Sequence, residues 1–222
     1  MAAFVGYGQM EAGFPAFARQ ISQVSTGTIG IAFAVNTAVI VVLQFWVLGR
    51  IAGHRRTRVL TVMTAVWAAS WVLLGLTGLA PATVAAVAGV LLFHAVFAFG
   101  ETMLQPTVPA MANDLAPDHL RGRHNAINSA AFQGGTILGP IAAGILLQHD
   151  LDTVYIGMLV AGCLTIAWMS MALERRITPP VNGVAEATAT AAVVVSDLAD
   201  DASSLAPVRR TGDAAGPVPD QV

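Results

Sequence analysis

The chain has 222 residues, of which 55% are hydrophobic and only 11% are charged, and its formal net charge at pH 7 is −2. A typical soluble domain is about 25% charged, so this composition excludes an ordinary water-soluble protein and indicates one that lies in a membrane. Cys163 is the single cysteine, which excludes an internal disulfide and a cysteine-rich metal cluster.

Six apolar segments of the chain are candidates for helices that cross the bilayer. A transmembrane helix needs about 20 predominantly apolar residues, and five segments meet that length. They cover approximately residues 28–48, 59–79, 82–103 or beyond, 125–147 and 154–173. Together with a first segment at residues 3–18, they predict an all-α membrane protein with a bundle of six transmembrane helices in residues 1–176.

The first segment is shorter than the other five. Its sixteen residues, 3–18, would reach about 24 Å as a helix, against about 30 Å for the hydrocarbon core. Either the bilayer thins at this helix, or the first helix is truncated and the chain starts inside a longer protein.

The arginines predict how the chain is oriented in the membrane. Eight of the nine arginines in residues 1–176 lie in three clusters, which follow the second, fourth and sixth apolar segments. Short loops rich in arginine stay on the cytoplasmic side. The loops 49–58 and 114–124 and the end at 174–176 should therefore be cytoplasmic, in a protein that crosses the plasma membrane several times.

The last part of the chain differs in composition from the spans. From residue 177 it is rich in Ala, Val, Pro, Asp and Ser without helical periodicity. This composition predicts a disordered cytoplasmic tail over residues 177–222.

Three ionisable side chains fall within the predicted spans, where each costs about 2.5 kcal/mol or more to insert. They are Glu11, His94 and Glu101. Glu101 shares one helix face with His94 and Gln105, because these residues recur at intervals that fit the helical period. One interpretation is that Glu101 gains and loses a proton with His94 nearby, and the other is that it is a structural acid bonded to a neighbouring helix.

Other polar residues in the spans are further candidates for a pathway. Glu11 lies in a segment rich in glycine, which indicates either a bent helix lining a cavity or a short helix that places Glu11 near the outer interface. Asn36 and Gln133 also lie within apolar segments. Either residue could face a cavity or bond to another helix.

Prolines and glycines mark two of the predicted helices. Pro106 and Pro109 follow Glu101 in the same helix, where each removes a backbone hydrogen bond and predicts a kink. In the fifth helix Gly135, Gly139 and Ala143 recur every four positions, and Pro140 and Gly144 adjoin them. This face of small residues predicts close approach to another helix.

Two of the arginine-rich loops resemble those of a known family. GRIAGHRRTRVL at 49–60 and NDLAPDHLRGRHNA at 113–126 are similar to the loops after the eighth and tenth helices of the major facilitator superfamily. The small and basic positions that carry this similarity are Gly49, Gly53, Arg55, Arg56 and Arg58 in the first loop and Arg121 and Arg123 in the second. His54 stands where the family motif often has an acid.

Three spans extend the resemblance. FVGYGQMEAGFPAF, GETMLQPTVPAMANDLAP and AFQGGTILGPIAAGILL are similar to the family's seventh, tenth and eleventh helices, and the similarity covers about residues 3–175. The resemblance implies the C-terminal six-helix half of a transporter, closest to proton-coupled multidrug efflux members. In that family two halves of six helices bind substrate between them near the midplane.

These features together predict secondary active transport of a small molecule by alternating access, driven by protons, with this chain supplying half the pathway. The expected partners are the lipid bilayer, the substrate, protons, and a missing N-terminal half or a second copy, but no nucleic acid. The alternative is a membrane module or remnant that does not transport. An enzyme is not expected, and neither a cofactor nor a metal, because His94 and Glu101 lack the His-Glu-x-x-His spacing of a zinc helix.

Overall fold

The computed structural model describes residues 1–115, 118–179 and 181–184. Within these residues, five helices are long and apolar enough to cross a membrane. They are α3 (Thr26–Ile51), α4 (Arg56–Thr77), α5 (Val84–Leu115), α6 (Arg121–Gln148) and α7 (Asp152–Glu174), and a short 3-10 helix, η2 (Asp118–Leu120), precedes α6. Each long helix coincides with one of the five predicted spans, which confirms the predicted all-α membrane fold.

The first predicted helix is present as a discontinuous segment, which we call the N-terminal segment. It consists of α1 (Ala2–Val5), the π-helix η1 (Gln9–Gly13) and α2 (Phe14–Gln20). The break falls at Gly6, whose backbone angles are φ −107° and ψ −94°. A Cβ atom at Gly6 would lie 2.5 Å from the indole ring of Trp67. Glycine is therefore needed where this segment approaches α4.

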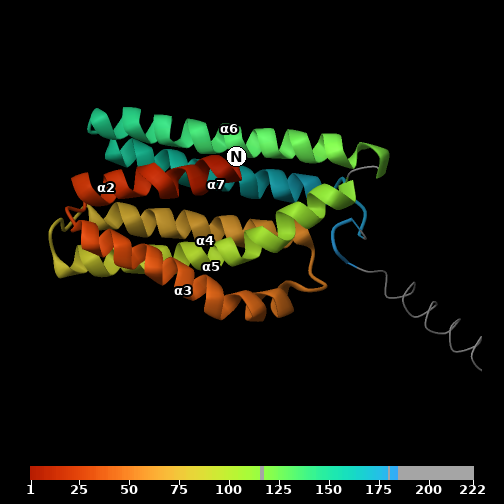
Figure 1. Cartoon of the computed structure of the whole chain (residues 1–222), viewed down its shortest axis with the longest axis horizontal. Coiled ribbons are helices and arrows are strands. Elements are labelled where there is room, and N and C mark those ends of the chain that lie inside the picture. Colours follow the sequence, from red (N-terminus) through yellow and green to blue (C-terminus); the bar gives the residue numbers. More distant parts are fainter. Residues whose placement is uncertain (116–117, 180, 185–222) are drawn as a thin grey trace, which may run out of the picture. The chain divides into compact units, whose positions relative to one another are not determined.

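The helices lie side by side in one bundle (Figure 1), with α4 packed against both α5 and α7, and α3 against α5. Aromatic side chains fill the contact between α4 and α5. The Trp67 ring stacks on Phe97 with centroids 4.6 Å apart, and its Nε1–H donates to the Phe97 carbonyl at 3.1 Å. The opposite surface of α3 stays apolar and uncovered, with Phe45 83% exposed. Such a surface suits contact with lipid.

The arginine-rich segments meet at one end of the bundle, which we call the arginine-rich end. Arg55, the N-cap residue of α4, and Arg58, in the first turn of α4, both pair with Glu174 at the end of α7, at 3.0 and 3.1 Å. Arg56 pairs with Asp114 at the end of α5. These ion pairs agree with an up-and-down path of the helices, because the ends of α3, α5 and α7 all lie together.

Part of the segment predicted as a tail is described by the structure and lies against α4. Asn182 is 1% exposed, its Oδ1 accepts from the Thr57 N–H at 3.0 Å, and its Nδ2 donates to the Thr57 hydroxyl at 3.0 Å. Residues 185–222, which make up most of the predicted tail, lie outside the described residues.

Candidate functional site

Glu101 is the centre of a group of polar side chains contributed by three parts of the bundle. Asn36 of α3 donates from Nδ2 to Glu101 Oε2 at 3.4 Å, and Gln105 donates from Nε2 to the Tyr7 hydroxyl at 2.6 Å. The Tyr7 hydroxyl also interacts with the Glu101 carboxyl. We call Tyr7, Asn36, Glu101 and Gln105 the carboxyl cluster.

Local structure explains how these four residues meet. Glu101 and Gln105 lie one turn apart on α5, so they share a face, and Asn36 is on α3, which packs along α5. Tyr7 follows the break at Gly6. The break sets the position of the Tyr7 ring, whose hydroxyl accepts from Gln105 and keeps its own proton for donation.

The carboxyl cluster contains one acid and three neutral partners. Within the part of the chain that the structure describes, no arginine forms an ion pair with Glu101. Amide and hydroxyl groups can hold a carboxyl in either protonation state, because they carry no charge that would fix it as a carboxylate. An acid of this kind within a span is suited to exchange a proton.

A cavity of about 230 Å³ adjoins the carboxyl cluster between the N-terminal segment, α5 and α6. Tyr7 and Gln105 form part of its wall, together with Pro109 and Asn128. Phe132 borders it as well and packs against the Tyr7 ring at a centroid distance of 5.4 Å. The cavity thus combines aromatic and amide groups beside the acid, which is the mixture that small-molecule sites use.

His94 does not belong to the carboxyl cluster, although the sequence predicts that it shares one helix face with Glu101. Its side chain is fully buried among the rings of Phe14, Phe33 and Phe93, at centroid distances of 4.3, 5.1 and 5.1 Å. Neither ring nitrogen has a hydrogen-bond partner among the described residues. The predicted helix face is therefore divided: His94 lies among aromatic rings, whereas Glu101 and Gln105 lie among polar groups.

The other two predicted pathway residues are exposed. Glu11 lies on η1 and Gln133 on α6, and both side chains face away from the packed interior. The carbonyl of Gln133 accepts from the Thr136 hydroxyl at 2.9 Å. The structure therefore brings Asn36, Glu101 and Gln105 together, but not Glu11 or Gln133.

The glycines of α6 lie against the N-terminal segment. A Cβ at Gly135 would lie 2.9 Å from the Ala3 Cβ, and one at Gly139 would lie 3.1 Å from the Gly8 Cα. Gly144, by contrast, faces open space, and Pro140 lies inside α6 without ending it. The first two glycines allow the two segments to approach closely.

Pro106 and Pro109 also lie inside a continuous helix. They belong to α5, which extends to Leu115. In Figure 1 the ribbon of α5 changes direction in its C-terminal half, where these prolines are. Because proline has no backbone N–H, the carbonyls one turn before Pro106 and Pro109 lose their hydrogen bonds, which explains a bend at this place.

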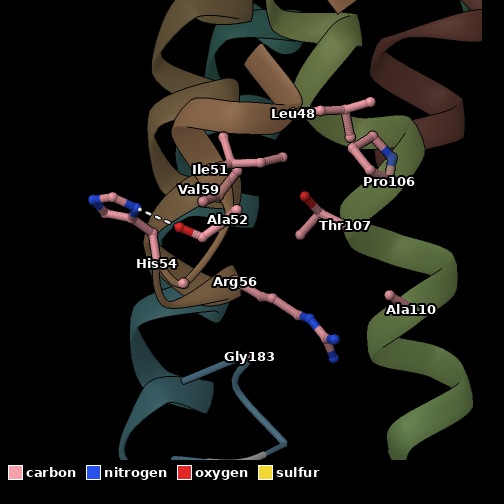
Figure 2. A pocket seen from close by; sticks show the side chains of 11 residues that line it. Leu48, Ile51, Ala52, His54, Arg56, Val59, Pro106, Thr107, Ala110 and Gly183 are labelled. Atoms are coloured by element: carbon pink, nitrogen blue, oxygen red, sulfur yellow. Dashed lines mark hydrogen bonds between the residues drawn. The ribbon is translucent and has the colours of Figure 1, made fainter. Parts of the chain in front are cut away.

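The loop motif between α3 and α4 borders a second cavity, of about 260 Å³ (Figure 2). Gly53, with a φ of +75°, makes the turn that reverses the chain. The Arg56 side chain extends toward α5, whereas His54 points to the other side. Gly49, in the last turn of α3, has open space around it, and Arg121 and Arg123 lie in the first turn of α6.

Sequence reasoning missed a buried polar contact that holds the N-terminal segment in place. Gln9 donates from Nε2 to the carbonyls of Phe4 and Gly139, both at 3.1 Å, and its Oε1 accepts from the Tyr155 hydroxyl at 2.9 Å. Gln9 is fully buried. The sequence feature that could have indicated this contact is the amide side chain of Gln9, which stands in an apolar segment rich in glycine.

Comparisons with known proteins define the class of protein that this bundle represents. The model of the Major Facilitator Superfamily matches residues 1–211, and the chain belongs to this family. Membership in a family of transporters confirms the prediction that the chain is not an enzyme.

One curated relative is the uncharacterized MFS-type transporter YttB of Bacillus subtilis (strain 168). It is 30% identical over 83 residues, which are 37% of this chain and 21% of that relative. The match therefore spans about a fifth of the relative's length. No solved structure matches the chain at a significant level.

Proposed function

We propose that the chain forms the second half of a secondary transporter that moves a small molecule by alternating access, with Glu101 as the proton-coupling acid. The observation that carries the proposal is the carboxyl cluster, in which one acid within a span is held by neutral groups of α3 and the N-terminal segment, and Gln105 in turn donates to Tyr7. Proton binding at Glu101 would change hydrogen bonds to both α3 and the N-terminal segment. Such a change links the protonation state to the relative positions of helices.

The polar surface beside the carboxyl cluster supports a half pathway. Asn128 and Gln133 are exposed on α6, a helix apolar enough to span the membrane. Polar groups within the bilayer need protein or water beside them. A second six-helix half, or a second copy of this chain, would cover this surface and complete a substrate cavity.

The proposed orientation follows from the arginine-rich end. Five arginines, namely Arg55, Arg56 and Arg58 with Arg175 and Arg176, lie there. The positive-inside rule places this end and the C-terminus in the cytoplasm, and the plasma membrane is the proposed location. Efflux of a lipophilic compound in exchange for protons fits the aromatic and amide wall of the cavity.

The test of the coupling acid is Glu101→Gln in the complete transporter that contains this chain. We expect the variant to abolish ethidium transport driven by a pH gradient in inverted membrane vesicles, because the amide cannot take up a proton. Thr37→Val, an exposed position next to Asn36 on α3, is the matched control and should retain transport. Unchanged transport in Glu101→Gln would overturn the assignment. Loss of transport in Glu11→Gln but not in Glu101→Gln would overturn it as well.

The half-pathway proposal has a separate test. The chain reconstituted alone in proteoliposomes should give no proton-coupled flux of ethidium, because one wall of the cavity is absent. Coupled flux from the chain alone would contradict the half pathway, unless cross-linking shows that two copies associate.

A further inference from the structure

Two hollows adjoin each other beside α7 near the arginine-rich end, and Met1 and Ala2 also border the larger one. Their volumes are about 540 and 410 Å³. Trp168, Ala172 and Arg176 border both of them. We call the two together the α7 groove.

Most of the wall of the α7 groove is apolar. Met169 and Leu173 line the larger hollow and Met171 the smaller, and Trp168 is 66% exposed. Exposed apolar side chains on a spanning helix contact acyl chains, while tryptophan favours the depth of the lipid headgroups. The α7 groove therefore runs from the hydrocarbon region toward the headgroup region.

Two guanidinium groups stand at the headgroup end of the α7 groove. Arg175 and Arg176 are both exposed and border the smaller hollow. Among the residues that the structure describes, neither arginine forms an ion pair, and the adjacent Glu174 is already shared by Arg55 and Arg58. The described residues therefore offer no ion-pair partner to these two positive charges next to the apolar hollows.

We propose that the α7 groove binds an anionic phospholipid. Its phosphate lies between Arg175 and Arg176, where charge-assisted hydrogen bonds hold it, and its acyl chains lie along Trp168 and the methionines. Basic groups beside an apolar groove at headgroup depth are the features that recognise such lipids. This site is independent of the proposed transport, since it requires only that α7 spans a bilayer.

The first test measures lipid binding to the full chain in neutral detergent by native mass spectrometry, with phosphatidylglycerol and phosphatidylcholine as probes. We expect saturable binding of phosphatidylglycerol, weakened roughly twenty- to thirtyfold in the double variant Arg175→Gln/Arg176→Gln. Arg50→Gln/Arg123→Gln removes the same charge from two exposed positions outside the groove and should bind like the native chain. Equal binding of both lipids, or equal loss in both double variants, would overturn the proposal.

A second arm tests the groove itself and the source of the phosphate. Ala172→Trp fills both hollows and should weaken phosphatidylglycerol binding at least tenfold, whereas Ala38→Trp, at an exposed position of α3, should not. Circular dichroism checks that each variant is folded. Unchanged affinity in folded Ala172→Trp, or saturable binding of inorganic phosphate as tight as that of the lipid, would reject a phospholipid site.

Discussion

At the scale of single residues, two ionisable side chains in the middle of α5, Glu101 and His94, lie in opposite surroundings. Glu101 receives a hydrogen bond from Asn36 at 3.4 Å and interacts with Tyr7, whereas both nitrogens of His94 lack partners in the described part of the chain. A buried polar atom without a partner destabilises the fold by about 1–3 kcal/mol. In the described structure His94 therefore acts as a flat ring among three phenylalanines.

Replacing His94 by Phe should keep or raise stability, because the ring shape is retained and two desolvated nitrogens are removed. We expect the melting temperature in detergent to stay the same or increase, and proton-coupled transport by the complete protein to continue. Trp67→Phe is the comparison, since it loses the hydrogen bond to the Phe97 carbonyl and should be destabilised by about 1–3 kcal/mol. Loss of coupling in a folded His94→Phe protein would show that His94 takes part in proton transfer.

At the scale of elements, the contact between the N-terminal segment and α6 depends on backbone proximity. Gly135 lies where a Cβ would come within 2.9 Å of the backbone N of Phe4, while the adjacent Gly134 has no atom within 4 Å. A backbone atom cannot move aside as a flexible side chain can. Gly135 therefore does not tolerate a larger side chain, whereas the adjacent Gly134 does.

Gly135→Ala should lower the free energy of unfolding by about 1–3 kcal/mol, because the methyl group forces the two segments apart. Gly134→Ala should be neutral or raise it by up to about 1 kcal/mol, since alanine favours helix more than glycine does. Unfolding in mixed detergent and sodium dodecyl sulfate measures both variants. Equal effects of the two substitutions would contradict the close packing of α6 on the N-terminal segment.

At the scale of the whole molecule, the arginine-rich end is joined by contacts between distant parts of the chain. The N-cap residue of α4, Arg55, makes no side-chain cap, and Asn182 instead accepts the Thr57 N–H at 3.0 Å. The carbonyl of Asn182 accepts in addition from the Arg56 N–H at 2.9 Å. A residue beyond α7 thus satisfies backbone donors that the start of α4 leaves free.

Asn182→Ala should destabilise the protein by about 1 kcal/mol, which is typical for the loss of an N-cap. It should also speed hydrogen exchange of the amides at residues 56–59, where the first turn of α4 would fray. Asn113→Ala, at an exposed position near the end of α5, controls for the loss of an asparagine. Unchanged exchange at residues 56–59 would mean that Asn182 does not cap α4.

Hydropathy by itself determined the five long spans and their order, because the length of an apolar run is a local property that the bilayer selects directly. The spacing of Glu101 and Gln105 likewise placed both on one helix face. Helical periodicity could not show that Glu101 and His94 have different surroundings, because it places both on the same helix face. Only the side chains that other helices pack against them differ. The capping of α4 by Asn182 was equally beyond reach, as it joins residues 125 positions apart.

The sequence alone thus determined membrane class, helix order and the residues that are costly to bury. Only the tertiary structure decided which of these residues meet. It placed Tyr7 beside Glu101 through the break at Gly6 and enclosed His94 in aromatic rings. The physical reason is that insertion depends on the composition of each segment, whereas hydrogen bonding of a buried group depends on side chains brought to it by other segments.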